Sequence, residues 1–170
     1  MSDQHEHASV RRVRAALESA GIATDIKHLD ESAGTAVLAA AALGVEVGQI
    51  ASSIVFKVST PEGDRPVLVV TSGRHRVDTN LVADTAGLPK LGRADADFVR
   101  EWSGFAIGGV SPVGWIHAGE SFKPITIVDT ALADYQVIWA ACGLHDVVCS
   151  MTFDDVVGVT GGTPLAAAID

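Results

Sequence analysis

The residues best suited to chemistry in this sequence form a glycine-rich loop, Gly108-Gly109-Val110-Ser111-Pro112-Val113-Gly114. Because glycine carries no Cβ, the backbone here can turn its N–H groups inward and cradle an anion or a developing oxyanion with main chain alone. Such a site needs no side-chain nucleophile. The same composition also suits a tight connection between two buried strands, and the loop by itself does not decide between the two interpretations.

Better-known catalytic motifs are missing from the sequence. It contains no Gly-Lys-[Ser/Thr] phosphate loop, and the proline inside the glycine-rich stretch, with no helix start after it, argues against a dinucleotide fingerprint. A Ser-His-Asp hydrolase stays open as an alternative, although the GxSxG elbow is absent. Its members would be Ser111, Asp129 and one of His75, His117 and His145.

The two cysteines, Cys142 and Cys149, predict neither a zinc site nor a disulfide framework, because they lack CxxC spacing and a nearby histidine pair. No metal site and no cofactor is expected. Residues 1–7 are polar and acidic, unlike a signal peptide, and no apolar run approaches the length of a membrane span. We therefore expect a cytoplasmic protein without a membrane partner.

The net charge of −9 and the pI near 5.0 argue against an autonomous nucleic-acid binder, because the molecule as a whole repels a phosphate backbone. An RNA partner would have to be held locally or with help. The basic clusters are Arg11 to Arg14, Arg74 to Arg76, and Lys90 with Arg93. We expect each cluster to be solvated surface rather than a phosphate clamp.

Length and composition predict one domain of mixed α/β type. The chain has 170 residues, 48% of them hydrophobic and 5% aromatic, so the core should be built of small aliphatic side chains. A flexible N-terminus over residues 1–8 should precede a single domain over residues 9–170.

Apolar periodicity and capping residues predict five helices. The first spans residues 9–20 and ends at Gly21. N-caps for the other four are Thr35, Asp78, Asp95 and Thr152. Three of those helices should end at Gly44, Gly87 and Gly104.

Apolar runs predict the strands. Residues 53–59 and 66–71 should form a hairpin at the centre of the sheet, and residues 22–29 an edge strand. Further strands are expected over residues 125–128, 137–140, 147–151 and 165–169, and residues 88–93 should form a short strand or an extended connection. Helices and strands alternate first and strands dominate later, which favours a barrel-like mixed sheet with helices around it.

Two charged residues lie on or beside these strands. Lys57 falls inside an apolar strand run, where it either faces outward or projects into a pocket in which partial desolvation makes its charge strongly felt. Asp129 follows the strand over residues 125–128 and is either a helix cap or a polar wall of a site.

The order of several motifs resembles the YbaK/EbsC family, the free-standing relatives of the editing domain inserted in bacterial prolyl-tRNA synthetases. These motifs are ASSIVF at 51–56, VLVVT at 67–71, SGFAIGGVSPVG at 103–114 and IVD at 127–129, preceded by the helix that Thr35 caps. The similarity runs from about the first helix to the C-terminus. The glycine-rich loop followed at this distance by a strand ending in aspartate is its most specific part.

The resemblance implies hydrolysis of the ester that links a wrongly attached small amino acid, such as cysteine, alanine, serine or threonine, to tRNA. In this family the GxxxP loop, here Gly108 to Pro112, lines the pocket for the aminoacyl group. Because an aminoacyl ester is already activated, backbone donors with a positioned water, or with a nucleophile on the substrate itself, are enough for this reaction. Small pocket walls would select by size. The implied partners are aminoacyl-tRNA, bound weakly through its acceptor end, and an aminoacyl-tRNA synthetase, with monomer and homodimer both open.

The sequence departs from the family at one position. Family members carry a lysine at the start of the central strand, in a Lys-[Ser/Thr/Asn]-Leu pattern, whereas Ser52-Ser53-Ile54 stands here. Lys57 lies five positions further along, and an odd offset places it on the opposite face of a strand from Ser52. Ser52 then orients water or the terminal ribose, the substrate differs, or deacylation has been lost.

These considerations give the expected site. Catalytic contacts are predicted from Gly108, Gly109, Val110, Ser111, Pro112 and Ser52, and substrate contacts from Ser53, Phe56, Lys57, Thr71, Gly114 and Asp129. Two other functions remain alternatives: a non-catalytic module that binds a small amino-acid-like ligand or a protein partner, and a hydrolase of another activated ester or thioester.

Overall fold

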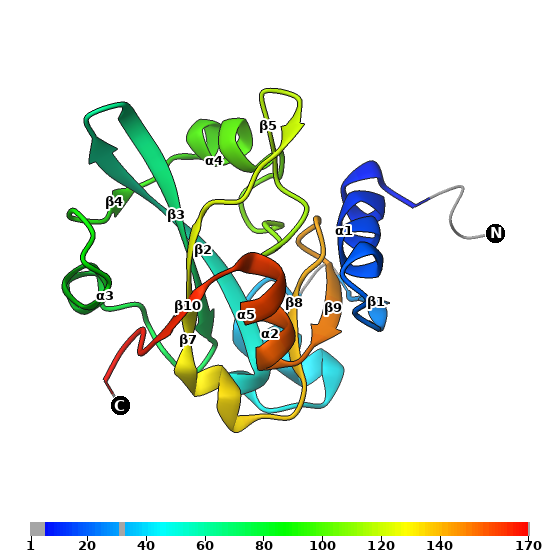
Figure 1. Ribbon diagram of the computed structural model, residues 1–170. Helices are drawn as coiled ribbons and strands as arrows, with labels where there is room; N and C mark the ends of the chain where they lie inside the picture. Colours follow the sequence, from blue (N-terminus) through cyan, green and yellow to red (C-terminus); the bar gives the residue numbers. More distant parts are fainter. Residues whose placement is uncertain (1–5, 31–32, 170) are drawn as a thin grey trace.

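The computed structural model, which describes residues 6–30 and 33–169, is built on one mixed eight-stranded sheet (Figure 1). The strand order is β1-β9-β8-β2-β3-β7-β10, with β4 paired to β2 beside this path. The strands are β1 (Ile26–His28), β2 (Ile50–Thr60), β3 (Gly63–Ser72), β4 (Gly92–Arg93), β7 (Ile125–Asp129), β8 (Ile138–Ala141), β9 (Val147–Met151) and β10 (Thr163–Leu165). The mixed α/β class is confirmed. Pairing of the end strands β1 and β10, which would close a barrel, does not occur among the described residues.

The centre of the sheet is the long β2–β3 hairpin, as predicted. Its antiparallel register runs unbroken from Ala51↔Ser72 to Thr60↔Gly63, so only Pro61 and Glu62 form the turn. Each strand contains four valine, isoleucine or leucine residues, which suit a pleated, buried surface.

Within the described residues, five α-helices pack on this sheet, and four of them begin at the predicted N-caps. The five helices are α1 (Ala8–Ser19), α2 (Ala36–Leu43), α3 (Thr79–Ala86), α4 (Ala96–Ser103) and α5 (Phe153–Thr160). The first helix is capped by His7 and Ala20, one residue before the predicted Gly21. The side chains of Thr35, Asp78, Asp95 and Thr152 each accept a hydrogen bond from an N–H of the first helical turn. Within the described residues, no helix has the length and apolar character needed to cross a bilayer.

Flexibility of the N-terminus over residues 1–8 stays a prediction, and the described residues Glu6 and His7 make contacts with α1. His7 caps α1, and Glu6 pairs with Arg14 at 2.6 Å. Residues 1–5 of that prediction lie outside the described part of the chain.

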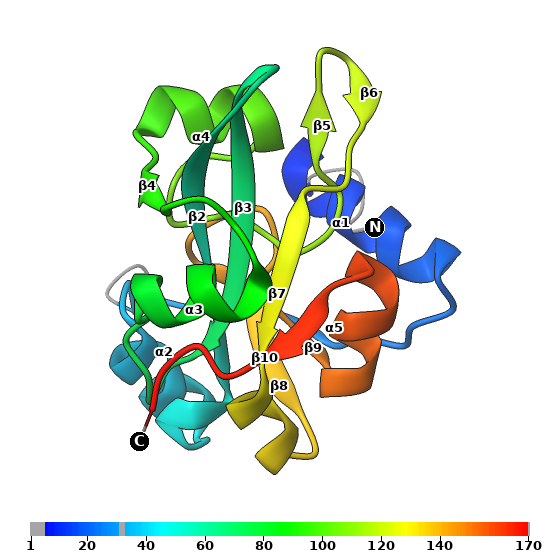
Figure 2. The same cartoon turned by 60° about the vertical axis from the view of Figure 1, so that its left-hand side comes forward.

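The two faces of the sheet carry different helices. On β3, Leu68 and Val70 join a core with α1, α4 and α5, whereas Val67 and Val69 pack against α3, which crosses in front of β3 in Figure 2. Helix α2 packs on Ile50 of β2 and on β8 and β9. Side-chain alternation along the strands produces this division.

Short elements account for most of the differences from the sequence-based expectation. The last strand is at Thr163–Leu165 rather than at residues 165–169, because α5 ends at Thr160 and Thr163 already pairs with Ile127. A small hairpin of β5 (Ile116–His117) and β6 (Glu120–Ser121) follows the glycine-rich loop and was not expected.

Asp129 is a fully buried junction at the end of β7. It accepts hydrogen bonds from the Ser72 N–H at 3.0 Å, the Thr71 hydroxyl at 3.2 Å and the Ala131 N–H at 3.1 Å, and His75 Nδ1 lies 2.8 Å away. Burial alone would raise the pKa of this carboxyl, but the hydrogen bonds and His75 outweigh burial and hold it below its usual range. Asp129 therefore joins the ends of β3 and β7 as an anion.

Replacing this anion should destabilise the fold in a pH-dependent way. Because its folded pKa is depressed, its contribution is present above the unfolded pKa and lost as pH falls through the folded one. Asp129→Asn should cost roughly 3 kcal/mol of unfolding free energy at pH 7, with the deficit shrinking below about pH 4. Urea unfolding across pH measures it. Asp134→Asn, at an exposed carboxylate that pairs with Arg74, should cost less than about 1 kcal/mol; equal losses for the two variants would contradict the assignment.

Candidate active site at a split in the sheet

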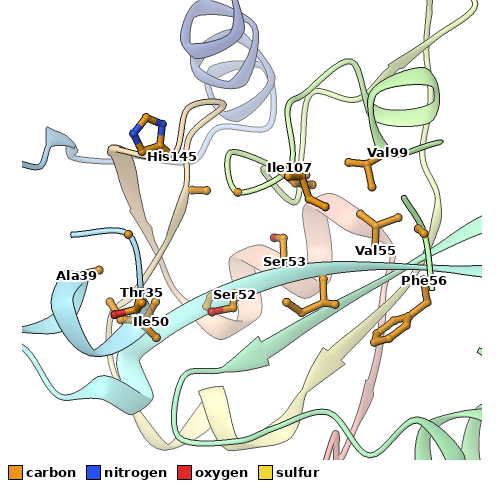
Figure 3. Close-up of a pocket in the computed structure, with 18 of the residues that line it drawn as sticks. Thr35, Ala39, Ile50, Ser52, Ser53, Val55, Phe56, Val99, Ile107 and His145 are labelled. Atoms are coloured by element: carbon orange, nitrogen blue, oxygen red, sulfur yellow. The ribbon is translucent and has the colours of Figure 1, made fainter. Parts of the chain in front are cut away.

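A cleft of about 580 Å³ opens along the edge of β2 that faces away from β3. Its walls come from β2, the start of α2, the segment around β4, the glycine-rich loop and the tip of the β8–β9 hairpin (Figure 3). Most of the lining is apolar or small.

The cleft exists because two strands share this edge of β2 without meeting. Of the residues of β2, strand β8 pairs only with Ile50 and Ala51, and β4 pairs only with Phe56 and Lys57. The stretch Ser52–Val55 between them has no strand neighbour on this side. We call this stretch the open edge.

The cleft wraps around the open edge and touches both faces of the sheet. Ser53 and Val55 point toward the glycine-rich loop, whereas Ser52 and Phe56 point to the face covered by α2 and α3 (Figure 3). Consecutive strand residues must diverge in this way. Ser53, rather than Ser52, is thus the serine that faces the loop.

The hydroxyl of Ser53 is buried and has no hydrogen-bond partner among the described residues. A buried hydroxyl without a partner is costly, so it calls for an explanation such as a bound water, an ion or a ligand. Here the hydroxyl borders a cleft large enough for a ligand.

Only part of the glycine-rich loop lines the cleft. Gly109 donates its N–H to the Ala106 carbonyl at 3.0 Å and so holds the turn itself. Gly108 and Val110, on either side, line the cleft, and their amides remain as candidate oxyanion donors. Of the loop residues predicted to be catalytic, Gly108 and Val110 are therefore the two that line the cleft.

Arg12 of α1 connects the last residue of this loop to the end of α4. Its guanidinium donates to the Gly114 carbonyl at 2.6 Å and to the Gly104 carbonyl at 3.3 Å, and it lies 4.5 Å from the centre of the Phe105 ring. Burial lowers the pKa of Arg12 from its ordinary value, yet an arginine remains charged at neutral pH.

Comparison with known proteins identifies this architecture. Residues 30–158 match the family model described as "Aminoacyl-tRNA editing domain". The chain belongs to this family. The match confirms the resemblance to YbaK proteins and gives the chain a role in aminoacyl-tRNA editing.

Two solved structures and one relative are similar to this chain over most of its length. A crystal structure reported as that of "a putative trans-editing enzyme for prolyl tRNA synthetase" is 35% identical, with a TM-score of 0.83 over 97% of this chain and 99% of that one. The "hypothetical protein APE2540" is 24% identical with a TM-score of 0.75, covers 91% of this chain and 97% of its own, and supports the fold alone. The Bacillus subtilis (strain 168) protein YwhH, described as uncharacterized, is 29% identical over 144 residues, which are 85% of this chain and 86% of that protein.

The editing domain places the other predicted residues of the loop away from the cleft. Ser111 is fully buried, and its hydroxyl accepts from the Val113 N–H at 3.1 Å. Pro112 and Gly114 line a second cavity of about 540 Å³ between the loop, α1 and α5. None of these three residues lines the cleft.

Three predicted substrate contacts lie elsewhere as well. Thr71 is buried and bonded to Asp129, and neither of them lines the cleft. Lys57 lies 3.9 Å from Asp64 across the hairpin and 5.7 Å from the centre of the Phe98 ring. Of the predicted substrate residues, Ser53 and Phe56 are the two that border the cleft.

The histidines do not assemble a Ser-His-Asp triad. His75 pairs with Asp129, while His117 lies 3.0 Å from the Glu101 carbonyl and stacks on a tryptophan ring. The Ser111 hydroxyl is engaged within its own loop.

Sequence reasoning missed Arg93 and His145 as residues of the cleft. Arg93 was expected to be plain surface, but its pairing with Phe56 brings β4 to one side of the open edge. His145 is exposed at the tip of the β8–β9 hairpin. Its Cβ lies 3.8 Å from the position that a Cβ on Gly108 would occupy. The pairing of distant strands creates both positions, and no local motif signals them.

The close approach of Gly109 to the β8–β9 tip yields a prediction. A Cβ at this position would lie 2.9 Å from Leu144 Cα and 3.1 Å from the Gly143 carbonyl oxygen, both backbone atoms that cannot turn away. Gly109→Ala should lower the unfolding free energy by about 2 kcal/mol and displace the loop. Gly158→Ala, in an open part of α5, should be neutral or stabilising by about 0.5–1 kcal/mol. Thermal melts measure both; matching effects would refute the close packing.

Proposed function

We propose that this editing domain is a trans-acting deacylase, which hydrolyses the ester between a small, wrongly attached amino acid and tRNA. The observation that carries the proposal is the meeting of the loop residues Gly108 and Val110 with the unpartnered Ser53 hydroxyl across one cleft. The two loop residues and Ser53 border one space that an acyl group could fill.

The chemistry follows from these donors. A hydroxyl nucleophile adds to the ester carbonyl, the loop amides stabilise the negative oxygen that forms, and the C–O bond to the ribose then breaks. The ribose oxygen leaves with a proton. Hydrolysis of an activated ester needs only modest help, so a water serves as nucleophile. Its oxygen ends in the released carboxylic acid, and one of its protons goes to the ribose oxygen that leaves.

Two groups at the cleft could assist this step. Arg93 and His145 are the titratable side chains among the described residues that line it. A neutral imidazole at His145 can take the proton from water, and the Arg93 cation can attract the phosphate next to the terminal ribose.

Selection by size would come from the small residues around the open edge. Ala39, Ala51 and Ala141 border the cleft together with Ile50 and Trp139. A pocket with walls of this kind accepts a small side chain and discriminates weakly between chains that differ by one methylene. We therefore expect cysteine, alanine, serine or threonine as the amino acid released.

The direct test is deacylation of tRNAs mischarged with each of these four amino acids. The wild-type protein should release one or two of them selectively. Ala141→Phe, which fills the cleft, should reduce the rate at least tenfold, whereas Ala15→Phe on the exposed side of α1 should leave it unchanged. Intact ester with all four tRNAs, in protein shown to be folded, would contradict the hydrolytic function.

A non-catalytic binding module is the second candidate, favoured by Ser52 at the position where the family carries lysine. It predicts binding of an aminoacyl ligand in the cleft without release of the ester. The deacylation test separates the two candidates.

The acidic surface yields a further prediction about partners. With a net charge of −9, the protein alone should bind tRNA weakly and with a shallow dependence on salt, so that a synthetase would supply most of the affinity in the cytoplasm. Binding titrations from about 50 to 200 mM salt measure this slope. Tight binding at physiological salt with a steep slope would rule out a need for help.

A further inference from the structure

The hydrogen-bond pattern between β2 and β3 shows which residues of β2 turn their main-chain N–H and C=O groups toward the open edge. The Ile50 carbonyl accepts from the Gly73 N–H on the β3 side at 2.8 Å, so even-numbered residues of β2 turn their N–H and C=O groups toward β3. The register continues without a bulge from Ala51 to Thr60. Odd-numbered residues therefore direct their N–H and C=O groups to the opposite edge.

Ser53 is the odd-numbered residue in the middle of the open edge. Strand β8 pairs as far as Ala51, and β4 begins its pairing at Phe56. No strand among the described residues pairs with Ser53, so its N–H and C=O face the cleft. Its hydroxyl is also buried and unpartnered there. One residue thus offers a donor, an acceptor and a hydroxyl to a ligand.

We propose that Ser53 binds the aminoacyl group of the substrate as a one-residue β-bridge, an inference that rests on the proposed function. Its C=O accepts from the α-ammonium group, and its N–H donates to the acyl carbonyl. Two residues of a hydrogen-bonded antiparallel pair exchange their two bonds in the same arrangement. The protein would thereby recognise the free α-amino group of the substrate as well as the side chain of the attached amino acid.

The length of the open edge supports a single amino acid as occupant. Four residues of strand span roughly 13 Å, and β8 and β4 close the two ends. A longer extended peptide would collide with one of these strands, whereas an amino acid ester fits between them. The glycine-rich loop, on the face to which Ser53 points, would then cover the acyl carbonyl.

Three variants isolate the groups involved. Ser53→Pro removes the N–H and the hydroxyl but no β3 ladder bond, because that N–H faces away from β3. Ser53→Ala removes the hydroxyl alone. Ser59→Pro is the matched control, since Ser59 is also odd-numbered on β2, lies beyond the β4 pairing, and has no strand partner on that side.

The probes are amide-linked, non-hydrolysable analogues in which alanine, cysteine, serine or threonine is joined to 3′-amino-3′-deoxyadenosine, plus a propionyl analogue without the α-amino group. Calorimetry should show the alanyl analogue binding wild type at least tenfold more tightly than the propionyl one. Ser53→Pro should lose tenfold or more in affinity and also lose this preference. Ser53→Ala should keep the preference, and Ser59→Pro should match wild type.

Equal binding of the alanyl and propionyl analogues to wild type overturns the bridge, and this comparison stands even if Ser53→Pro fails to fold. Wild-type affinity in folded Ser53→Pro, or no binding of any of the four aminoacyl analogues, overturns it as well. The proposed function fails separately. If the protein deacylates tRNA but binds the alanyl and propionyl analogues equally, the editing function stands and the bridge is refuted. If it prefers the alanyl analogue but does not deacylate tRNA, the bridge is supported and hydrolysis is refuted.

Discussion

The structure of this editing domain depends on how one edge of β2 is shared. Strand β8 pairs with its first two residues and β4 with Phe56 and Lys57, while β3 covers the whole opposite edge. Pairing with β3 along its whole length holds β2 extended past the gap, where the described residues supply no strand partner on the other side. The cleft, its orphaned Ser53 hydroxyl and its two-faced lining all follow from this arrangement.

The glycine-rich loop is positioned against the open edge by contacts from distant parts of the chain. Arg12 of α1 bonds to the Gly114 carbonyl at the end of the loop and to the Gly104 carbonyl at the end of α4. The tip of the β8–β9 hairpin packs on Gly109, and Gly143 at that tip packs in turn on Ser9 of α1, so a Cβ at either glycine would meet backbone. The loop is therefore preorganised, which is what main-chain stabilisation of an oxyanion requires.

The sequence was informative where local chemistry decides structure. The caps at Thr35, Asp78 and Asp95, and the glycines that end their helices, are read directly from residue types because each interaction spans only a few residues. The central hairpin was predictable for the same reason. The site was harder, because the open edge arises from pairing between β2, β4 and β8, and nothing within β2 shows which residues lose their neighbour. Attention to the family lysine position favoured Ser52, whereas the strand alternation turns Ser53 to the loop.

The measurement that tests the open edge most directly is amide hydrogen exchange along β2. The Ser53 amide should exchange far faster than that of Ile54, whose N–H is directed toward β3, and a bound non-hydrolysable alanyl-adenosine analogue should slow exchange at Ser53 but not at Ser59. Protection of Ser53 equal to that of Ile54 in the free protein would mean that the edge is already paired, and would contradict the account.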